Sequence, residues 1–343
     1  MIQFVCPHCK KNLSVEEKSF ACLSCQKNWS TKNNVPSFAE KDIYWGEFEE
    51  EKLKNAIAIF DHSNKKDFYN FIERDLGRTD FIFGKARTDF MYYLPLSKDA
   101  SVLDVGCGLG IHSFNIAPFV GQVYSFDQSV TRVSFCLLRK KIEEITSLHF
   151  FHGEVTSLPF KKDSFNIIMM NGVVEWLGNI NRHKSPRQDQ IFVLKQMFDY
   201  LKKDGVLYIG IENRFATAYL HGIDHNGLRF TSFMPRCLAS FLTYIYKGHF
   251  YRTYTYSIFG YKKLLKESGF DVKKTDFYIA YPGYNLPQYI IPFNDISALR
   301  HFFQTMTSQK GLRGLILRYV SQSDFLIKIA RHFFFSYLIY TRK

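Results

Sequence analysis

The feature that most constrains this chain is a short apolar strand that runs directly into three alternating glycines. Residues 102–110 read VLDVGCGLG, with Asp104 two residues before the first glycine. Gly106, Gly108 and Gly110 permit positive φ angles and leave no Cβ in the way. A nucleoside-sized ligand can therefore lie against the backbone at the carboxyl end of this strand.

The acidic residues near the glycines favour one nucleoside cofactor over another. Asp127 ends the next extended run, 21 residues after Gly106, about the span at which an acid reaches ribose hydroxyls. A dinucleotide fingerprint requires glycine where this chain has Ile111, and Asp104 would repel a pyrophosphate. At roughly 4 Å and an effective dielectric near 20, two like charges repel by about 4 kcal/mol. S-adenosylmethionine carries a sulfonium and an ammonium and no phosphate, so the charge favours it.

Strand and helix patterns alternate beyond Asp127. A continuous apolar run, residues 167–170, ends at Asn171, as expected of a parallel strand buried on both faces. Residues 190–201 have the pattern of an amphipathic helix, residues 206–211 form a further apolar strand, and residues 260–270 read as a helix with a glycine cap. The order predicts an α/β domain.

With D-x-G-x-G-x-G and an acid after the second strand, this order resembles the class I S-adenosylmethionine-dependent methyltransferases. The resemblance covers residues 100–293 and implies a Rossmann-like, mostly parallel seven-stranded sheet with helices on both faces. Glu154 stands where the family more often has Asp near the adenine amino group. The implied cofactor-binding residues are Asp104, Gly106, Gly108, Gly110, Asp127, Gln128, Glu154, Val155 and Asn171.

The amino-terminal segment carries two C-x-x-C pairs separated by twelve residues, Cys6 with Cys9 and Cys22 with Cys25. Pairs at this spacing can surround Zn²⁺ with four thiolates in a module too small to bury a core of its own. We therefore expect a zinc ribbon over residues 1–38, with free buried thiols or a redox pair as the alternatives. No apolar leader opens the chain, which favours a cytoplasmic protein.

Two further segments flank the predicted domain. Residues 39–99 have a helical pattern and are expected to link the ribbon to the domain and cap the cofactor pocket. Residues 294–343 read as a basic, aromatic helical tail, and after Asp295 this tail has eight Lys and Arg against Asp324 alone. Basic residues among Phe and Tyr are typical of an interfacial helix, so the tail predicts either peripheral contact with an anionic membrane or a helix packed on the core.

Methyl transfer to a hydroxyl or amide also needs a proton acceptor. Glu175 and Glu212 follow the fourth and fifth strands, and His183, His221 and His225 lie in the adjoining loops. We expect Glu212 or His225 to be the base. The insertion, residues 212–257, mixes aromatic residues with Arg, His and Asp, a composition that suits a saccharide or a base stacked beside a phosphate.

Three functions remain open from the sequence. Segments including residues 44–47 and 210–215 resemble a bacterial subgroup of these methyltransferases associated with surface-polysaccharide biosynthesis, which implies a saccharide or lipid-linked glycan acceptor. A zinc ribbon before the same domain also resembles ribosomal RNA guanine methyltransferases, and the net charge of +13 is compatible with RNA. The third possibility is a nucleoside-binding interaction module without catalysis.

Overall fold

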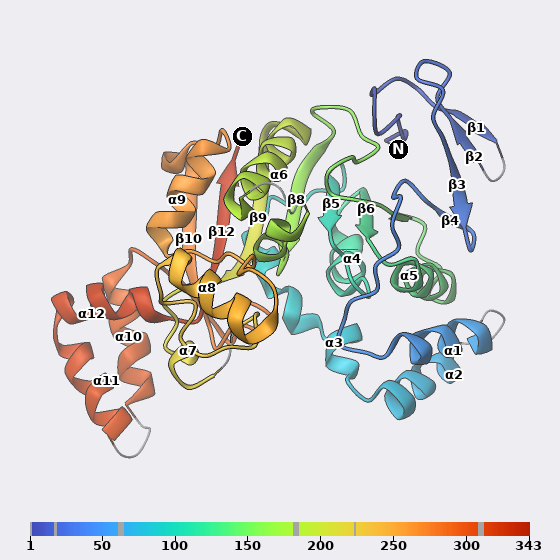
Figure 1. Ribbon diagram of the computed structural model, residues 1–343. Helices are drawn as coiled ribbons and strands as arrows, with labels where there is room; N and C mark the ends of the chain where they lie inside the picture. Colours follow the sequence, from blue (N-terminus) through green and yellow to red (C-terminus); the bar gives the residue numbers. More distant parts are fainter. Residues whose placement is uncertain (1, 17–18, 61–64, 181–184, 223, 308–311) are drawn as a thin grey trace. The chain divides into compact units, whose positions relative to one another are not determined.

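The computed structural model describes residues 2–16, 19–60, 65–180, 185–222, 224–307 and 312–343 (Figure 1). The chain divides into two compact units. The first consists of Met1–Met169 and Asp199–Val206, and the second of Met170–Phe198 and Leu207–Lys343. The predicted α/β class is confirmed, with one large sheet and one small amino-terminal sheet.

The large sheet has eight strands in the order β11-β10-β12-β9-β8-β5-β6-β7, one more than expected. Strands β8, β5, β6 and β7 are parallel to their neighbours, whereas β10 is antiparallel to both β11 and β12. The strands are β5 (Ser101–Val105), β6 (Gln122–Asp127), β7 (Leu148–His152), β8 (Phe165–Asn171), β9 (Leu201–Glu212), β10 (Thr275–Tyr281), β11 (Tyr289–Pro292) and β12 (Ser336–Arg342).

In the first unit, β5 and β6 each lead into a helix, as the sequence predicts. Helix α4 (Ile111–Ile116) begins directly after Gly110, and α5 (Val130–Glu143) begins after Ser129. The Ser129 hydroxyl accepts a hydrogen bond from the Arg132 N–H and so caps the first turn of α5. The register pairs Val102 with Ile167 and with Val123, which places the buried β5 between two strands.

The amino-terminal segment forms a four-stranded antiparallel sheet: β1 (Ser14–Glu16), β2 (Ser19–Ala21), β3 (Asn28–Lys32) and β4 (Val35–Pro36). Beyond β4, Ser37 bridges to His152 at the end of β7, and its hydroxyl lies 2.8 Å from His152 Nδ1. The rings of Phe4 and Phe38 pack edge-on against Phe151. The small sheet is therefore packed on the edge of the large one within the first unit.

The linking segment is helical. It comprises α1 (Glu50–Phe60), α2 (Lys65–Phe71), a π turn (Ile72–Leu76), α3 (Thr79–Phe83) and a 3-10 segment (Lys85–Tyr93). Its apolar side chains share a core with α5 that includes Leu53, Phe68, Ile72, Phe135 and Leu138. Burial of this face against α5 explains why these short helices form.

The second unit contains the remaining helices and the carboxyl-terminal segment. The helices are α6 (Pro186–Tyr200), α7 (Ala218–His221), α8 (Arg236–Lys247), α9 (Ile258–Glu267), α10 (Ile296–Met306), α11 (Leu312–Gln322) and α12 (Asp324–Ala330). The predicted helical tail is correct as far as α12 and wrong beyond it. Residues 336–342 form β12, because their side chains are buried from Ser336 to Thr341 and pair with β10.

Among the described residues, no helix combines the length and the apolar character that crossing a bilayer requires.

Candidate active site and metal centre

The loop between β5 and α4 has the backbone that its glycines predict. The φ angles of Gly106, Gly108 and Gly110 are 66°, 58° and 78°, all in the left-handed region. A Cβ on Gly110 would lie 3.0 Å from the ring of Phe114, so the position is also sterically closed to larger residues. The loop therefore presents bare backbone at the carboxyl end of β5, as a nucleoside site requires.

Asp104 lies behind the loop and does not project into it. Its carboxylate is buried and accepts a 2.5 Å hydrogen bond from the Ser113 hydroxyl on α4. Burial raises the pKa of Asp104 to about 6, so the group is mostly ionised at neutral pH. The structure thus shows Asp104 as a buried carboxylate bonded to α4, and its contact with a cofactor stays a prediction.

Asp127 is held in a network at the end of β6. Oδ2 accepts the N–H of Gly108 and Oδ1 accepts the N–H of Ser129, both at 3.0 Å. Arg132 Nη1 lies 3.6 Å from Oδ2, and its Nη2 donates to Glu47 at 3.1 Å. Two carboxylates, those of Asp127 and Glu47, thus contact a single guanidinium, and the local balance stays negative.

Sequence reasoning missed Arg132, although its position five residues after Asp127, in the first turn of α5, was a usable signal. Its side chain is 10% exposed. A Cβ on Gly108 would lie 3.4 Å from Arg132 Nη2, and one on Gly46 would lie 2.9 Å from it. The two glycines therefore allow the guanidinium to sit between the linking segment and the glycine loop.

The other predicted cofactor residues lie in different surroundings. Gln128 is exposed, and its carbonyl accepts the N–H of Ile43. Glu154 Oε1 accepts the N–H groups of Glu40 and Lys41 at 3.1 and 3.3 Å. This carboxylate is therefore hydrogen-bonded to the backbone of the linking segment. Val155 is half-buried.

Asn171 belongs to the second unit. Its Oδ1 accepts a hydrogen bond from the Tyr208 hydroxyl at 2.8 Å, and its Nδ2 lies 3.5 Å from Asn285 Oδ1. A Cβ on Gly210 would lie 2.2 Å from Asn171 Oδ1. The glycine at 210 therefore makes room for this amide on the neighbouring strand.

The second unit brings Glu175, Glu212 and His225 together. Glu175 follows β8, Glu212 ends β9, and His225 lies in the insertion; His225 Nε2 is 3.3 Å from Glu212 Oε2. Glu212 is fixed from two sides, because the Tyr284 hydroxyl lies 3.3 Å from Oε1 and the Tyr261 hydroxyl donates to its backbone carbonyl. Glu212 and His225, which the sequence offers as alternative bases, thus form an ion pair.

Glu175 is completely buried beside this pair. Neither of its carboxylate oxygens has a hydrogen-bond partner among the described residues. Burial and the charge of Glu212 raise the pKa of Glu175 to about 8. Burial lowers the pKa of His225, but the neighbouring Glu212 carboxylate outweighs it and raises the value to about 9. At neutral pH both Glu175 and His225 of the cluster are therefore mostly protonated.

The other histidine candidates are not in this cluster. His221 is exposed at the end of α7, and His183 lies outside the described residues. One ligand atom each from Glu175, Glu212 and His225 lie within 4.8 Å of one another, a spacing that a divalent cation could also use.

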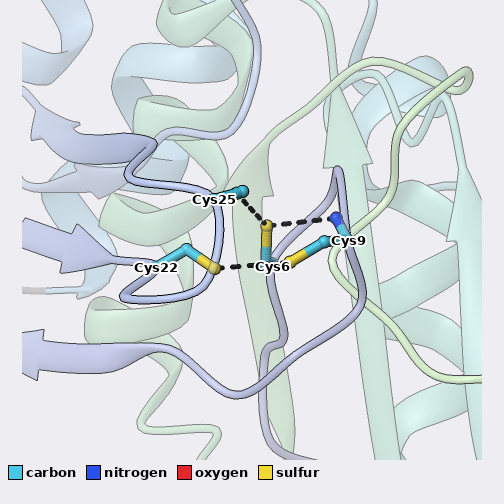
Figure 2. A group of neighbouring side chains, drawn as sticks. All are labelled: Cys6, Cys9, Cys22 and Cys25. Atoms are coloured by element: carbon cyan, nitrogen blue, oxygen red, sulfur yellow. Dashed lines mark hydrogen bonds between the residues drawn. The ribbon is translucent and has the colours of Figure 1, made fainter.

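The four amino-terminal cysteines converge as the spacing predicts (Figure 2). Cys6 Sγ lies 3.5 Å from Cys25 Sγ, Cys9 Sγ lies 3.4 Å from Cys22 Sγ, and all four sulfurs are within 4.8 Å of one another. Zn–S bonds of about 2.3 Å in a tetrahedron place sulfurs about 3.8 Å apart. The four thiols therefore fit a structural zinc ion, with Cys6 and Cys22 buried.

Comparisons with known proteins identify the domain that holds the glycine loop. Residues 96–225 match the family model described as a methyltransferase domain. A segment of 108 residues is 29% identical to demethylmenaquinone methyltransferase of Lactococcus lactis subsp. lactis, covering 31% of this chain and 39% of that protein. The match thus spans well under half the length of this curated relative.

Several solved structures resemble the chain at low identity. The YcgJ protein from Bacillus subtilis has 14% identity and a TM-score of 0.42, covering 76% of this chain and 98% of that one. Haemonchus contortus phosphoethanolamine N-methyltransferase 2, in complex with S-adenosyl-L-methionine, has 15% identity and a TM-score of 0.45, covering 80% and 59%. Together with the parallel strands and the glycine loop, the domain match identifies a methyltransferase domain with the Rossmann-like fold of the class I S-adenosylmethionine-dependent enzymes.

Proposed function

We propose that this protein transfers a methyl group from S-adenosylmethionine to a hydroxyl of a saccharide or lipid-linked glycan. The observation that carries the proposal is the left-handed glycine loop at the end of β5, closed by the Asp127 hydrogen bond to Gly108, within a matched methyltransferase domain. The negative balance of carboxylates around Arg132 supports a cationic cofactor over a phosphate-bearing one.

The cofactor would lie on the glycine loop, with Asp127 toward the ribose and Gln128, Glu154, Val155 and Asn171 as the further contacts that the family resemblance implies. When bound, S-adenosylmethionine supplies an electrophilic methyl carbon with a neutral thioether as the leaving group. The chain's own task is then to orient the acceptor hydroxyl and to take its proton.

His225 is the better placed of the two proposed bases. Its side chain is 25% exposed, whereas that of Glu212 is 5% exposed. Nε2 faces Glu212, which leaves Nδ1 for the acceptor. In this arrangement Glu212 orients the imidazole and stabilises its protonated form, as a carboxylate does for a histidine base. Glu175, neutral at pH 7, sits beside the pair without adding a second negative charge.

Some aromatic residues of the insertion are committed to packing and are not open to an acceptor. Tyr251 is buried, and the Arg236 guanidinium lies 4.4 Å from the centre of the Tyr254 ring and 5.2 Å from that of Tyr251. These rings are therefore structural. The preference for a saccharide rests on the hydroxyl-directed base and on the resemblance of residues 44–47 and 210–215 to the polysaccharide-associated subgroup.

Calorimetry and isotope transfer test the proposal. Purified protein should bind S-adenosylmethionine more tightly than NAD, and tritium from its methyl group should enter a lipid-extractable, RNase-resistant fraction of a cell extract. Label in an RNase-sensitive fraction would favour ribosomal RNA as the acceptor. Heat of binding without any transfer would favour the non-catalytic module, and tighter binding of NAD would refute the cofactor assignment.

A pH profile tests the roles within the pair. Because Glu212 raises the pKa of His225 to about 9, transfer should rise with pH up to that value. The E212Q variant should shift the profile toward the ordinary histidine range near pH 6.5. An unchanged profile in E212Q would show that His225 is not the base.

We further propose that Cys6, Cys9, Cys22 and Cys25 hold structural zinc. Elemental analysis of the purified protein should give one zinc per chain, and the C22S/C25S variant should contain none. Because Phe4 and Phe38 join the small sheet to the large one, zinc removal should also lower the melting temperature of the first unit. A metal-free protein with unchanged melting would refute the site.

A further inference from the structure

Helix α8 (Arg236–Lys247) has its apolar side on the outside. Leu238, Phe241, Tyr244 and Ile245 lie on one face at helical spacing, and Tyr246 and Phe250 extend it. These six side chains are 44–69% exposed, whereas the helix buries only the small residues Ala239 and Thr243. We call the six exposed residues the α8 face. A helix that packs on its own domain normally has the opposite pattern.

The orientation of α8 is fixed by the residues that precede and begin it. The Arg214 guanidinium donates to the carbonyls of Ser232, at 2.7 Å, and of Met234, in the segment that leads into the helix. Arg236, in the first turn, donates to the Thr255 carbonyl and lies over the Tyr254 ring. These contacts hold the helix with its apolar face outward.

The chain around α8 has an unusual charge composition. Residues 225–266 contain seven Lys and Arg and no Asp or Glu. Arg229 and Lys247, one on each side of α8 in the sequence, are both exposed, as is His249. An apolar face in a segment that carries cations and no carboxylates of its own is complementary to a surface with an apolar interior and anionic groups at its boundary.

We infer that the α8 face docks on an anionic lipid bilayer, with its aromatic and aliphatic side chains at the level of the headgroups and Arg229 and Lys247 near lipid phosphates. Tyr244 and Tyr246 suit this depth, because their rings are apolar and their hydroxyls can remain hydrated. The inference does not depend on the acceptor or on methyl transfer.

This assignment adds a second membrane contact to the one predicted from the sequence. The predicted tail contact relied on residues 325–343, of which Ser336–Tyr340 are buried in β12. Phe325, Leu326, Ile329 and Phe333 of the same tail are exposed. Burial in β12 thus removes part of the predicted tail surface, whereas all six residues of the α8 face are exposed.

Vesicle flotation of the full-length protein tests the inference. The protein should float with phosphatidylcholine vesicles that contain phosphatidylglycerol, and binding should weaken with salt. The F241S/I245S variant should lower the bound fraction by about tenfold, since it removes two large apolar side chains from the contact. R229E/K247E should reduce binding to anionic vesicles to the level seen with phosphatidylcholine alone.

The matched control is I316S/Y319S on α11, where the two side chains are 53% and 63% exposed, close to the 57% and 60% of Ile245 and Phe241. It should float like the wild type. Equal losses in both double variants, or no flotation of the wild type, would overturn the inference. A dimer seen by analytical ultracentrifugation and abolished by F241S/I245S, without flotation, would assign the face to a second copy of the chain instead.

Discussion

Two acidic clusters in this protein differ in how completely their oxygens are hydrogen-bonded. In the first unit, Asp104 accepts the Ser113 hydroxyl, and both oxygens of Asp127 accept backbone N–H groups. In the second unit, both oxygens of Glu175 and Oε2 of Glu212 are buried without a hydrogen-bond partner among the described residues. The first cluster is already satisfied by the protein, and the second is not.

The difference indicates different roles for residues of the same charge. A carboxylate with its donors in place is held rigidly and keeps its charge, which suits the binding of a cation. A bare buried carboxylate costs free energy until it takes up a proton or a ligand. The raised pKa of Glu175 expresses this cost, and such a group is poised to exchange protons during a reaction.

The largest expected effect is the loss of the proton acceptor in the unsatisfied cluster. H225Q should reduce methyl transfer by about a thousandfold, within the range for removal of a general base, while leaving S-adenosylmethionine affinity unchanged. Rate and calorimetry measured side by side separate the two quantities. H221Q, an exposed histidine of α7, is the matched control and should keep wild-type turnover. Turnover within threefold of wild type in H225Q would remove this residue from catalysis.

The next effect is a dependence of stability on pH that comes from Glu175. Its pKa in the folded protein is raised from 4.5 to about 8, so the folded state binds the proton more tightly. Wild-type stability should therefore fall as pH rises through this window. Because Gln resembles the protonated acid, E175Q should exceed wild type by about 5 kcal/mol at high pH and match it near the lower end of the window.

Urea unfolding at both ends of that window measures the difference. E73Q, which changes an exposed carboxylate in the first unit, should leave the pH dependence of wild type unaltered. If E175Q and wild type lost stability in parallel as the pH rises, deprotonation of Glu175 would not be the cause of the loss, and the proposed difference between the two clusters would be wrong.

A smaller effect is expected where a donor is removed from the satisfied cluster. S113A deletes the hydroxyl that bonds Asp104 and should lower the free energy of unfolding by about 2 kcal/mol, the size of a hydrogen bond to a charged group. The pKa of Asp104 should rise further above 6, measurable by NMR titration. The control is S134A, which removes a buried hydroxyl that has no hydrogen-bond partner among the described residues. The free energy of unfolding should therefore change less in S134A than in S113A.

The smallest effect concerns the charge of Asp127. D127N keeps an oxygen acceptor but loses the ion pair with Arg132, and it should weaken S-adenosylmethionine binding by about tenfold, since only Glu47 would then balance this guanidinium near the loop. Calorimetry against D99N, which alters an exposed side chain, provides the control. Equal affinities in D127N and wild type would show that the loop backbone alone holds the cofactor.

Sequence patterns were sufficient where the signal is local. The glycines at 106, 108 and 110 predicted left-handed backbone because few other residues adopt it, and the two cysteine pairs predicted a four-sulfur cluster because the spacing is short. Glu212 and His225 were also accessible as alternative candidates, since both follow the strand end at which chemistry was expected, and the structure adds that they pair.

Features that depend on packing between distant segments were not accessible. Arg132 reaches Glu47 across 85 residues, and the composition of α5 does not reveal that partner. Residues 336–342 contain a short apolar run, Tyr337–Tyr340, that is compatible with helix or strand, and pairing with β10 decides between them. The outward face of α8 was hidden for the same reason, because composition does not say which side of a helix is buried.

The position of β12 has a consequence for biosynthesis. Thr275–Ala280 in β10 pair with Ser336–Thr341. More than fifty further residues must therefore be synthesised after β10 before the strand that pairs with this edge is available. During translation this neighbour is still inside the ribosome while β10 is already exposed, and the open strand edge can pair with other chains. Premature termination within the last ten codons should therefore yield insoluble product, although every residue of the glycine loop and of the Glu175 cluster has been synthesised.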